Sequence, residues 1–361
     1  MLNYLFEYLT QYYSGFDVFR YLTLRIILAA LTALIISLLI GPIIIKHLVS
    51  KKLYQNIRKD GPKSHIKEKS KTPSMGGLII ITSIITSTIL WGDILSKYIW
   101  ILLFVLISFG IVGFYDDYKK FIFSSSDGIS GKSKLLLQIL LAGSAAYFIY
   151  VSSMSSIELS LMLPFFKNFS LYLGILFIPW TILVIVGSSN AVNLTDGLDG
   201  LAILPCILIA AAFVLFAYVE GNFNIANYLL IPYLSGVSEI AIFSAAIVGS
   251  GLGFLWYNSY PAEVFMGDVG SLSLGAALAT IAVLLRLEII YAIMGGVFVM
   301  EALSVILQVF SYKLFKKRIF KMSPIHHHFE LMGWPEPKII VRFWIITFVL
   351  VLIALASLKI R

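Results

Sequence analysis

Long apolar stretches alternate with short polar connections along almost the whole chain. Runs of about 18 or more mostly apolar residues are long enough to cross the hydrocarbon core of a bilayer as helices. Ten such segments lie at residues 22–45, 76–92, 98–115, 134–152, 171–189, 200–219, 239–257, 269–285, 289–312 and 339–358. The pattern predicts an all-α polytopic membrane protein of about ten transmembrane helices, in which residues 1–361 form a single integral membrane domain.

Composition agrees with this pattern. The chain is 59% apolar and only 13% charged, whereas average soluble domains are about 45–50% apolar and about 25% charged. Residues 1–20 are rich in aromatic side chains, and they lack the basic start and small-residue cleavage site of a signal peptide. We expect them to lie at the membrane interface. Because no soluble basic domain is predicted, the expected partner is the lipid bilayer and not nucleic acid.

Lysine and arginine residues are distributed unevenly among the connections between the predicted helices. The first connection is the one that follows the first predicted helix. The odd connections carry nine between residues 46 and 71, four between 119 and 134, and seven between 313 and 342. The even connections carry only Lys97, Lys167 and Arg286. Because basic loops stay in the cytoplasm, both termini are predicted to be periplasmic. The net charge of +8 also suggests a cytoplasmic face that attracts anionic lipid headgroups or a phosphorylated substrate.

Four polar motifs stand out at the ends of the apolar segments. They are Tyr115–Tyr118, which holds two aspartates, Asn193–Gly200, Phe265–Asp268 and Pro324–His328. All four fall in odd connections, so the predicted topology brings them to the cytoplasmic surface. Carboxylates and imidazoles near a bilayer are costly, and a set of them on one side indicates a reaction or transport site.

The acidic motifs suit a magnesium site that receives a phosphate substrate. Mg²⁺ prefers one or two carboxylates together with waters and substrate phosphates. Asp116 and Asp117 are adjacent, so on a helix they point about 100° apart and are expected to have two different roles. The alternative is a solvated helix end, in which the carboxylates and the following Lys119 and Lys120 carry no ligand.

Two further acidic motifs have the same pair of interpretations. Asn193, Asp196 and Asp199 are spaced by three residues and can converge on one ligand, such as a ribose or an amide-bearing sugar. A helix-capping turn is the alternative, although one aspartate would suffice for a cap. Asp268 lies among glycines that let backbone come close to a ligand, and a plain helix cap competes with that reading.

His326, His327 and His328 are consecutive. Three consecutive side chains cannot share one face of a regular helix, which argues against a three-ligand metal site. We expect a loop that presents one or two of these imidazoles to a phosphate. An interfacial loop without a ligand is the alternative.

The segment 128–133 has the ending of a phosphate-binding P-loop. That motif needs a glycine five residues before Gly131, where Ser126 stands, and a preceding strand, whereas this segment joins two predicted membrane helices. A P-loop is therefore excluded, and Lys132 remains as a simple basic contact for phosphate.

Taken in order, these motifs resemble those of the phospho-N-acetylmuramoyl-pentapeptide transferases. The resemblance spans about residues 45–344 and rests on residues 56–65, 72–77, 116–117, 193–201, 267–268 and 324–330. Enzymes of this kind belong to the polyprenyl-phosphate N-acetylhexosamine-1-phosphate transferases, so the resemblance implies a ten-helix bundle with its active site in cytoplasmic loops.

The resemblance also implies an activity. Phospho-MurNAc-pentapeptide would pass from UDP-MurNAc-pentapeptide to undecaprenyl phosphate, giving lipid I and UMP, with Mg²⁺ as cofactor. The expected location is the bacterial cytoplasmic (inner) membrane, in peptidoglycan biosynthesis. The resemblance further implies that two copies of the chain form a homodimer.

Site residues follow from the same resemblance. Asp268 is the implied Mg²⁺ ligand, Asp116 is a base for the lipid phosphate or a residue that positions it, and Asp117 is a second essential carboxylate. His326 is expected close to the diphosphate. The resemblance implies that Asn193, Asp196 and Asp199 contact the nucleotide sugar and that Asn258 and Phe265 lie near the uridine. It implies that Lys69, Lys120 and Lys132 contact phosphates. His327 and His328 are further implied substrate-binding residues. Lys71 stands where the family usually has glycine, which leaves Lys69 and Lys71 as alternative phosphate contacts.

Two other functions remain open at this point. A sister enzyme that transfers GlcNAc-1-phosphate to a polyprenyl carrier would share the carboxylate motifs, although the histidine motif favours the muramoyl branch. A secondary transporter would also place carboxylates among ten helices. It is expected to bury them near the bilayer midplane within an internal repeat, and the sequence has no such repeat.

Overall fold

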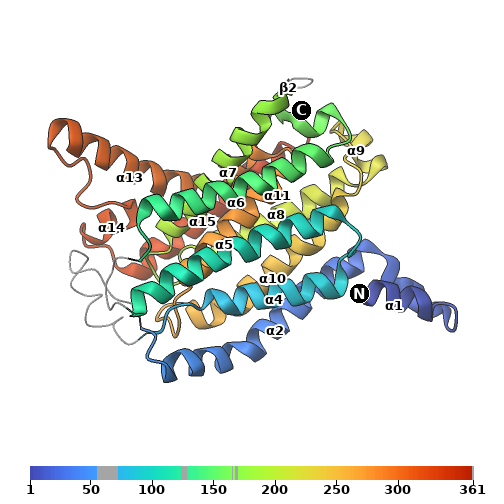
Figure 1. Ribbon diagram of the computed structural model, residues 1–361, viewed down its shortest axis with the longest axis horizontal. Coiled ribbons are helices and arrows are strands. Elements are labelled where there is room, and N and C mark those ends of the chain that lie inside the picture. Colours follow the sequence, from blue (N-terminus) through green and yellow to red (C-terminus); the bar gives the residue numbers. More distant parts are fainter. Residues whose placement is uncertain (55–71, 123–127, 165, 167–169, 360–361) are drawn as a thin grey trace.

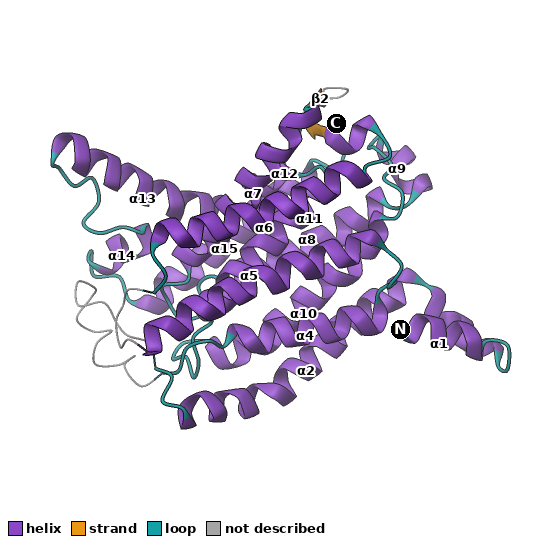
Figure 2. Cartoon of the chain, in the orientation of Figure 1, coloured by secondary structure: helices purple, strands orange, loops and turns teal. Residues whose placement is uncertain are grey.

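The protein is a bundle of long helices with one small hairpin of strands, as a computed structural model shows (Figures 1 and 2). The structure describes residues 1–54, 72–122, 128–164, 166 and 170–359. Its α-helices are α1 (Leu2–Leu9), α2 (Leu22–Ser50), α4 (Gly77–Trp91), α5 (Lys97–Ile122), α6 (Gly131–Ser152), α7 (Phe177–Thr195), α8 (Ile203–Glu220), α9 (Phe223–Leu229), α10 (Ile240–Asn258), α11 (Gly267–Leu284), α12 (Glu288–Met294), α13 (Gly296–Phe315), α14 (Ile325–Glu330) and α15 (Glu336–Ala356). The antiparallel strands are β1 (Ser160–Met162) and β2 (Ser170–Tyr172), and short 3-10 helices lie at Ser14–Arg20, Ser156–Leu159, Gly174–Leu176 and Val237–Glu239.

The predicted polytopic membrane architecture is confirmed. Within the described ranges, nine helices are long and apolar enough to span a membrane, and α4 is a shorter apolar helix of 15 residues. These ten helices coincide with the ten segments expected from the apolar pattern, because a run of apolar residues that must leave water has to satisfy its backbone internally.

Two boundaries differ from the sequence prediction. The segment 171–189 begins as the strand β2 and a 3-10 turn, so α7 starts only at Phe177. The segment 289–312 is not one helix, since it divides into α12 and α13 at Gly295. Glycine has no side chain to pack and weakens a helix interior, which allows the change of direction there.

The centre of the bundle is α11, which has 89% of its spanning window buried. It packs against α5 on one side and α7 on another, and α10 packs against α2 and α8. Small residues such as Gly270, Ser273, Gly275 and Ala276 line α11 and are all buried. Such residues let neighbouring backbones approach closely in a membrane bundle.

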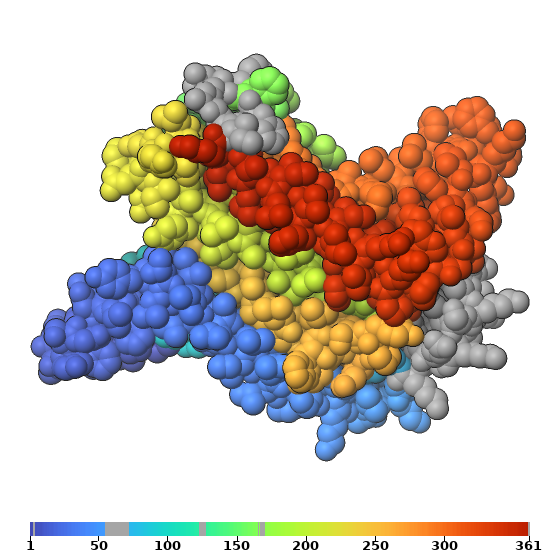
Figure 3. Space-filling model, turned by 180° about the vertical axis from the view of Figure 1, so that it is seen from behind, coloured from blue at the N-terminus to red at the C-terminus, as the bar shows by residue number. Residues whose placement is uncertain are grey.

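Two parts project from this packed centre (Figure 3). The N-terminal residues, including α1, form one projection, and α13 forms another, with only 28% of its spanning window buried. Exposed apolar side chains of α13 include Ile306, Phe310 and Phe315. In a membrane protein, such faces are suited to lipid contact.

The spanning helices and α4 alternate in direction along the chain, so alternate connections between them meet at the same end of the bundle (Figure 1). The C-terminal ends of α5, α7 and α10 therefore lie with the N-terminal ends of α6, α8 and α11. Figure 1 shows α14 on the left of the bundle, whereas both chain termini lie on the right. The polar motifs are thus gathered at the end away from the termini.

Candidate active site

Three carboxylates meet where the end of α5 touches the start of α11. Asp116 and Asp117 lie in the last turns of α5, and Asp268 lies in the first turn of α11. Each offers an oxygen within 4.8 Å of the others. Gly113 makes this approach possible, since a Cβ atom at that position would lie 2.2 Å from the backbone oxygen of Asp268. The two motifs predicted to share a surface are therefore in one cluster.

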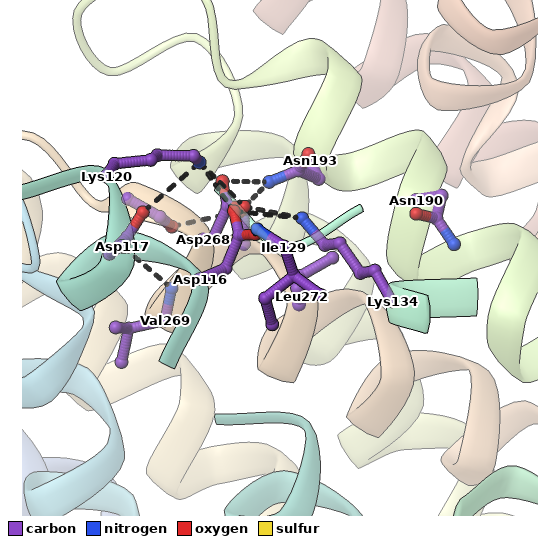
Figure 4. Close-up of polar contacts among 12 residues, drawn as sticks. Asp116, Asp117, Lys120, Ile129, Lys134, Asn190, Asn193, Asp268, Val269 and Leu272 are labelled. Atoms are coloured by element: carbon purple, nitrogen blue, oxygen red, sulfur yellow. Dashed lines mark hydrogen bonds and ion pairs between the residues drawn. The ribbon is translucent and has the colours of Figure 1, made fainter. Parts of the chain in front are cut away.

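Two lysines neutralise most of the negative charge of this cluster (Figure 4). The Lys120 ammonium lies 2.7 Å from Asp116, 3.1 Å from Asp268 and 3.6 Å from Asp117. The Lys134 ammonium lies 2.5 Å from Asp268 and 3.5 Å from Asp116. Buried charges are stable only when they are paired, so these five side chains depend on one another.

Further donors fix the orientation of each carboxylate. Asn193 donates from Nδ2 to Asp268 at 2.8 Å and to the Ser271 hydroxyl at 2.8 Å. The backbone N–H of Ile129 donates to Asp116 at 2.7 Å, and that of Val269 donates to Asp117 at 3.3 Å. These contacts tie α5, α7, α11 and the segment before α6 together around the cluster, as Figure 4 shows.

The donor set of this cluster fits a hard divalent cation. It supplies carboxylate oxygens from three aspartates, and such oxygens are the ligands that Mg²⁺ prefers. Lys120 is partly exposed, with 31% of its side chain accessible, so it lies at the solvent-facing side of the cluster. The residues that would hold the cation are Asp116, Asp117 and Asp268.

Of the lysines near the start of α6, Lys134 lies beside the carboxylates, and it was not among the predicted site residues. Lys132 is exposed in the first turn of α6, and its contact with phosphate stays a prediction. The signal was present in the helix period, because Lys134 lies four residues before Gln138 on the buried stripe of α6. Lys69, and its alternative Lys71, lie outside the described residues.

The side chains of the motif Asn193–Gly200 have different partners within the protein. Asn193 reaches the carboxylate cluster, and Asp196 is the half-buried residue that directly follows α7. Asp199 is buried and accepts the backbone N–H of Ala262 at 3.0 Å. Contacts of Asp196 and Asp199 with a nucleotide sugar stay predictions.

Asn258, the last residue of α10, is also held internally. Its side chain accepts the N–H of Gly200 at 3.1 Å and donates to the carbonyl of Val264 at 2.8 Å, with 2% of the residue exposed. It therefore fastens the turn after α7 to the connection between α10 and α11. The predicted contact with the uridine is untested by this arrangement.

We expect Asn258→Ala to lower stability, because it leaves the N–H of Gly200 and the carbonyl of Val264 unsatisfied. The loss should be about 1–3 kcal/mol for each group left without a partner. The unfolding midpoint of the detergent-purified protein measures this, with Asn227→Ala on the exposed face of α9 as the control. An unchanged midpoint with weakened binding of a uridine nucleotide would instead assign Asn258 to the ligand alone.

The segment before α4 pairs with the segment before Asp268. The backbone N–H of Gly76 donates to the carbonyl of Phe265 at 2.8 Å, that of Gly77 donates to Met266 at 2.8 Å, and that of Phe265 donates to Pro73 at 2.9 Å. Phe265, predicted to lie near the uridine, is half-buried in this pairing. The start of α11 is thereby fixed against a stretch that lies some 190 residues earlier in the chain.

The three histidines lie in the short helix α14, so the prediction of a loop is wrong. Glu301 of α13 accepts the N–H of Ile325 at 2.8 Å and so satisfies the first turn of this helix. His326 is buried beside Glu301. His327 contacts Glu330 at 2.6 Å, and His328 accepts the N–H of Lys321 at 3.1 Å. The three imidazoles therefore point to three different partners, and their contacts with substrate stay predictions.

Comparison with known families agrees with this geometry. Residues 99–286, more than half of the chain, match the family model of glycosyl transferase family 4, and this stretch contains all three carboxylates and both lysines of the cluster. Residues 69–81 match signature 1 of phospho-N-acetylmuramoyl-pentapeptide transferase. That signature includes the glycines that pair with the segment before Asp268. The chain therefore belongs to glycosyl transferase family 4, in its phospho-N-acetylmuramoyl-pentapeptide transferase branch.

Proposed function

We propose that the protein transfers phospho-MurNAc-pentapeptide from UDP-MurNAc-pentapeptide to undecaprenyl phosphate, giving lipid I and UMP. Phosphoglycosyl transfer is the chemistry of its family. The specific substrates, the location in the bacterial cytoplasmic membrane and the role in peptidoglycan synthesis belong to this proposal. Helices long and apolar enough to span a membrane support a substrate that is carried in the bilayer.

The observation that carries the proposal is the pairing of the signature segment with the carboxylate cluster. Gly76 and Gly77 lie in the matched signature and hydrogen-bond to the residues that lead directly into Asp268. The part of the chain that distinguishes the muramoyl branch is thus connected to the residues suited to phosphate chemistry.

The reaction requires one phosphorus–oxygen bond to form and one to break. An oxygen of the lipid phosphate attacks the phosphorus that carries the sugar, and the bond from that phosphorus to UMP breaks. Charge spreads over the phosphate oxygens in the transition state, so the protein contributes mainly positioning and neutralisation. Mg²⁺, when bound by the aspartates, would supply a cation that stabilises the departing UMP.

The side chains of the cluster suit that task. Lys120 and Lys134 are held within 3.1 Å of Asp268 before any substrate arrives. Their ammoniums would donate to phosphate oxygens, while Asp116 keeps them at the correct place. Asn193 fixes the carboxylate of Asp268 from the other side. Preorganised charges of this kind need no rearrangement during the reaction.

We expect Lys134→Gln to lower turnover about tenfold or more, because a hydrogen bond to a charged group contributes about 1.5–3 kcal/mol and 1.36 kcal/mol corresponds to tenfold. Lys132→Gln, two residues earlier on the exposed face of α6, is the matched control and should stay within about twofold, as surface changes usually do. Initial rates of UMP release measure both variants. A larger loss for Lys132→Gln would instead support the phosphate contact predicted for Lys132.

The direct test of the proposed function uses the purified full chain in detergent with undecaprenyl phosphate and Mg²⁺. UDP-MurNAc-pentapeptide and UDP-GlcNAc are supplied in parallel, and UMP and the lipid-linked product are both measured. Product from the muramoyl substrate alone is the expected result. Product from UDP-GlcNAc alone would assign the chain to the sister activity, and no product from folded protein with either would refute the proposal.

A further inference from the structure

A buried carboxylate and a buried imidazole form a pair beside the Asn193–Gly200 motif. Glu301 of α13 and His326 of α14 are both fully buried, and Oε1 of Glu301 lies 3.0 Å from Nδ1 of His326. The other oxygen of Glu301 accepts the N–H of Ile325 at 2.8 Å. Because an ionised carboxylate can only accept, the proton between the two side chains belongs to Nδ1.

The second nitrogen of the His326 ring faces the Asn193–Gly200 motif. A Cβ atom at Gly197 would lie only 2.3 Å from Nε2, so the ring fits there because that residue is glycine. Nε2 has no hydrogen-bond partner among the described residues. An unsatisfied buried polar atom in a native structure calls for an explanation, and a ligand that supplies the partner is one.

We propose that Glu301 is a positioning residue that holds the Nδ1 proton of His326 and so keeps Nε2 directed at the substrate. This inference rests on the proposed function, since it assigns Nε2, which accepts when the proton is on Nδ1, to a hydroxyl or amide N–H of the nucleotide-sugar substrate. A carboxylate that orients an imidazole fixes both its tautomer and its ring direction. Glu301 itself contacts no substrate and acts only through His326.

Glu301→Gln tests the tautomer with little change in shape. Its amide has one accepting oxygen and one donating nitrogen, whereas the native side chain uses two accepting oxygens. The N–H of Ile325 can only donate, so the amide oxygen must face it and the amide nitrogen must face Nδ1. The ring then has to accept at Nδ1 and carry its proton on Nε2, which reverses the hydrogen-bonding character of the nitrogen that faces the site.

We expect Glu301→Gln to lower kcat about tenfold or more, because loss of an orienting partner typically costs about 10- to 100-fold. In the His326→Gln background the same change should cost nothing further. This double-mutant cycle separates action through His326 from a general structural effect. Ser304→Ala is the matched control, since its buried hydroxyl donates only to the backbone oxygen of Glu301 within the same helix. Unfolding midpoints check all variants.

A second readout does not depend on turnover. Solid-state NMR of the full chain labelled with ¹⁵N-histidine in lipid should show a protonated Nδ1 for His326 in the native protein and an unprotonated Nδ1 in Glu301→Gln. His328 is an internal reference, because its Nδ1 accepts the N–H of Lys321. His326→Gln assigns the signal, and Glu301→Asp, which keeps two accepting oxygens, should retain the native pattern.

The outcomes distinguish this inference from the proposed function. Suppose that the native protein turns over its substrate. An unchanged rate in Glu301→Gln then overturns the positioning role, and so does a loss of rate from Glu301→Gln that is just as large in the His326→Gln background. Either result leaves the proposed function standing. An unprotonated Nδ1 in the native protein overturns it independently. If the native protein turns over neither UDP-sugar, the proposed function fails. In that event a protonated Nδ1 and a shift of the His326 Nε2 signal on adding UDP-MurNAc-pentapeptide support the positioning role, and an unshifted signal overturns it.

Discussion

Asp268→Asn should lower turnover about a thousandfold or more at millimolar Mg²⁺. The variant keeps the shape of the side chain, but it reduces the cluster from three carboxylates to two against the two ammoniums of Lys120 and Lys134. A carboxylate, the group that Mg²⁺ prefers as a ligand, is then replaced by a neutral amide. Several kcal/mol of charge stabilisation depend on a catalytic metal ion, and each 1.36 kcal/mol is tenfold in rate.

The measurement is UMP release as a function of Mg²⁺ concentration. The half-saturating Mg²⁺ concentration should rise in Asp268→Asn if the residue is a ligand. Glu263→Gln removes an exposed carboxylate from the connection that leads to α11 and is the matched control, for which the Mg²⁺ dependence should be native. Native turnover with a native Mg²⁺ dependence in Asp268→Asn would exclude the residue as a metal ligand.

Much of the fold was accessible from the sequence, because a membrane helix must be apolar along its whole length. Each of the ten predicted segments contains a long apolar helix, although the segment 289–312 holds two helices. The break between α12 and α13 was not predicted, although Gly295 and Gly296 stand side by side there. The helix α14 was also missed, since six residues with three histidines carry no apolar period. Its stability depends on the distant Glu301, which satisfies its first turn.

The candidate site was predictable only in outline. Alternation of spanning helices brings Asp116, Asp117 and Asp268 to one end, and the structure places them together. The partners of these residues depend on side-chain direction. Lys132 and Lys134 are two residues apart in sequence, yet only the second faces the carboxylates.

Glu301 shows a different limit of sequence reasoning. It lies 25 residues before His326, and no spacing rule connects a residue inside one helix with a residue of the next. A signal was nevertheless available, because a single carboxylate inside an apolar segment is costly unless it has a function or a partner. Charged residues within predicted spans should therefore be examined together with the motifs at their ends.

Asp116→Asn is the second variant for which we expect a large effect, a loss of turnover of about a hundredfold or more. Asp116 accepts from Lys120 at 2.7 Å, from the N–H of Ile129 at 2.7 Å and lies 3.5 Å from Lys134. An amide at this place would present a donor to one of these donors. Breaking one partner of a buried charge network costs about 3–5 kcal/mol, which is enough for such a loss.

The pH dependence of this variant decides between the two roles open for Asp116. If the residue positions the two ammoniums, the loss should be the same at every pH, because the second pKa of a phosphate monoester is about 6 and most of the lipid phosphate is already dianionic at neutral pH. If it is a base, higher pH should restore part of the rate. The pH profile of kcat is measured for native protein, Asp116→Asn and Lys132→Gln, whose exposed side chain serves as the control. Each oxygen of Asp116 already accepts from another group around the cluster. We therefore expect the pH profile of kcat for Asp116→Asn to keep the native shape at a lower level. Recovery of kcat at high pH would instead assign Asp116 as the base.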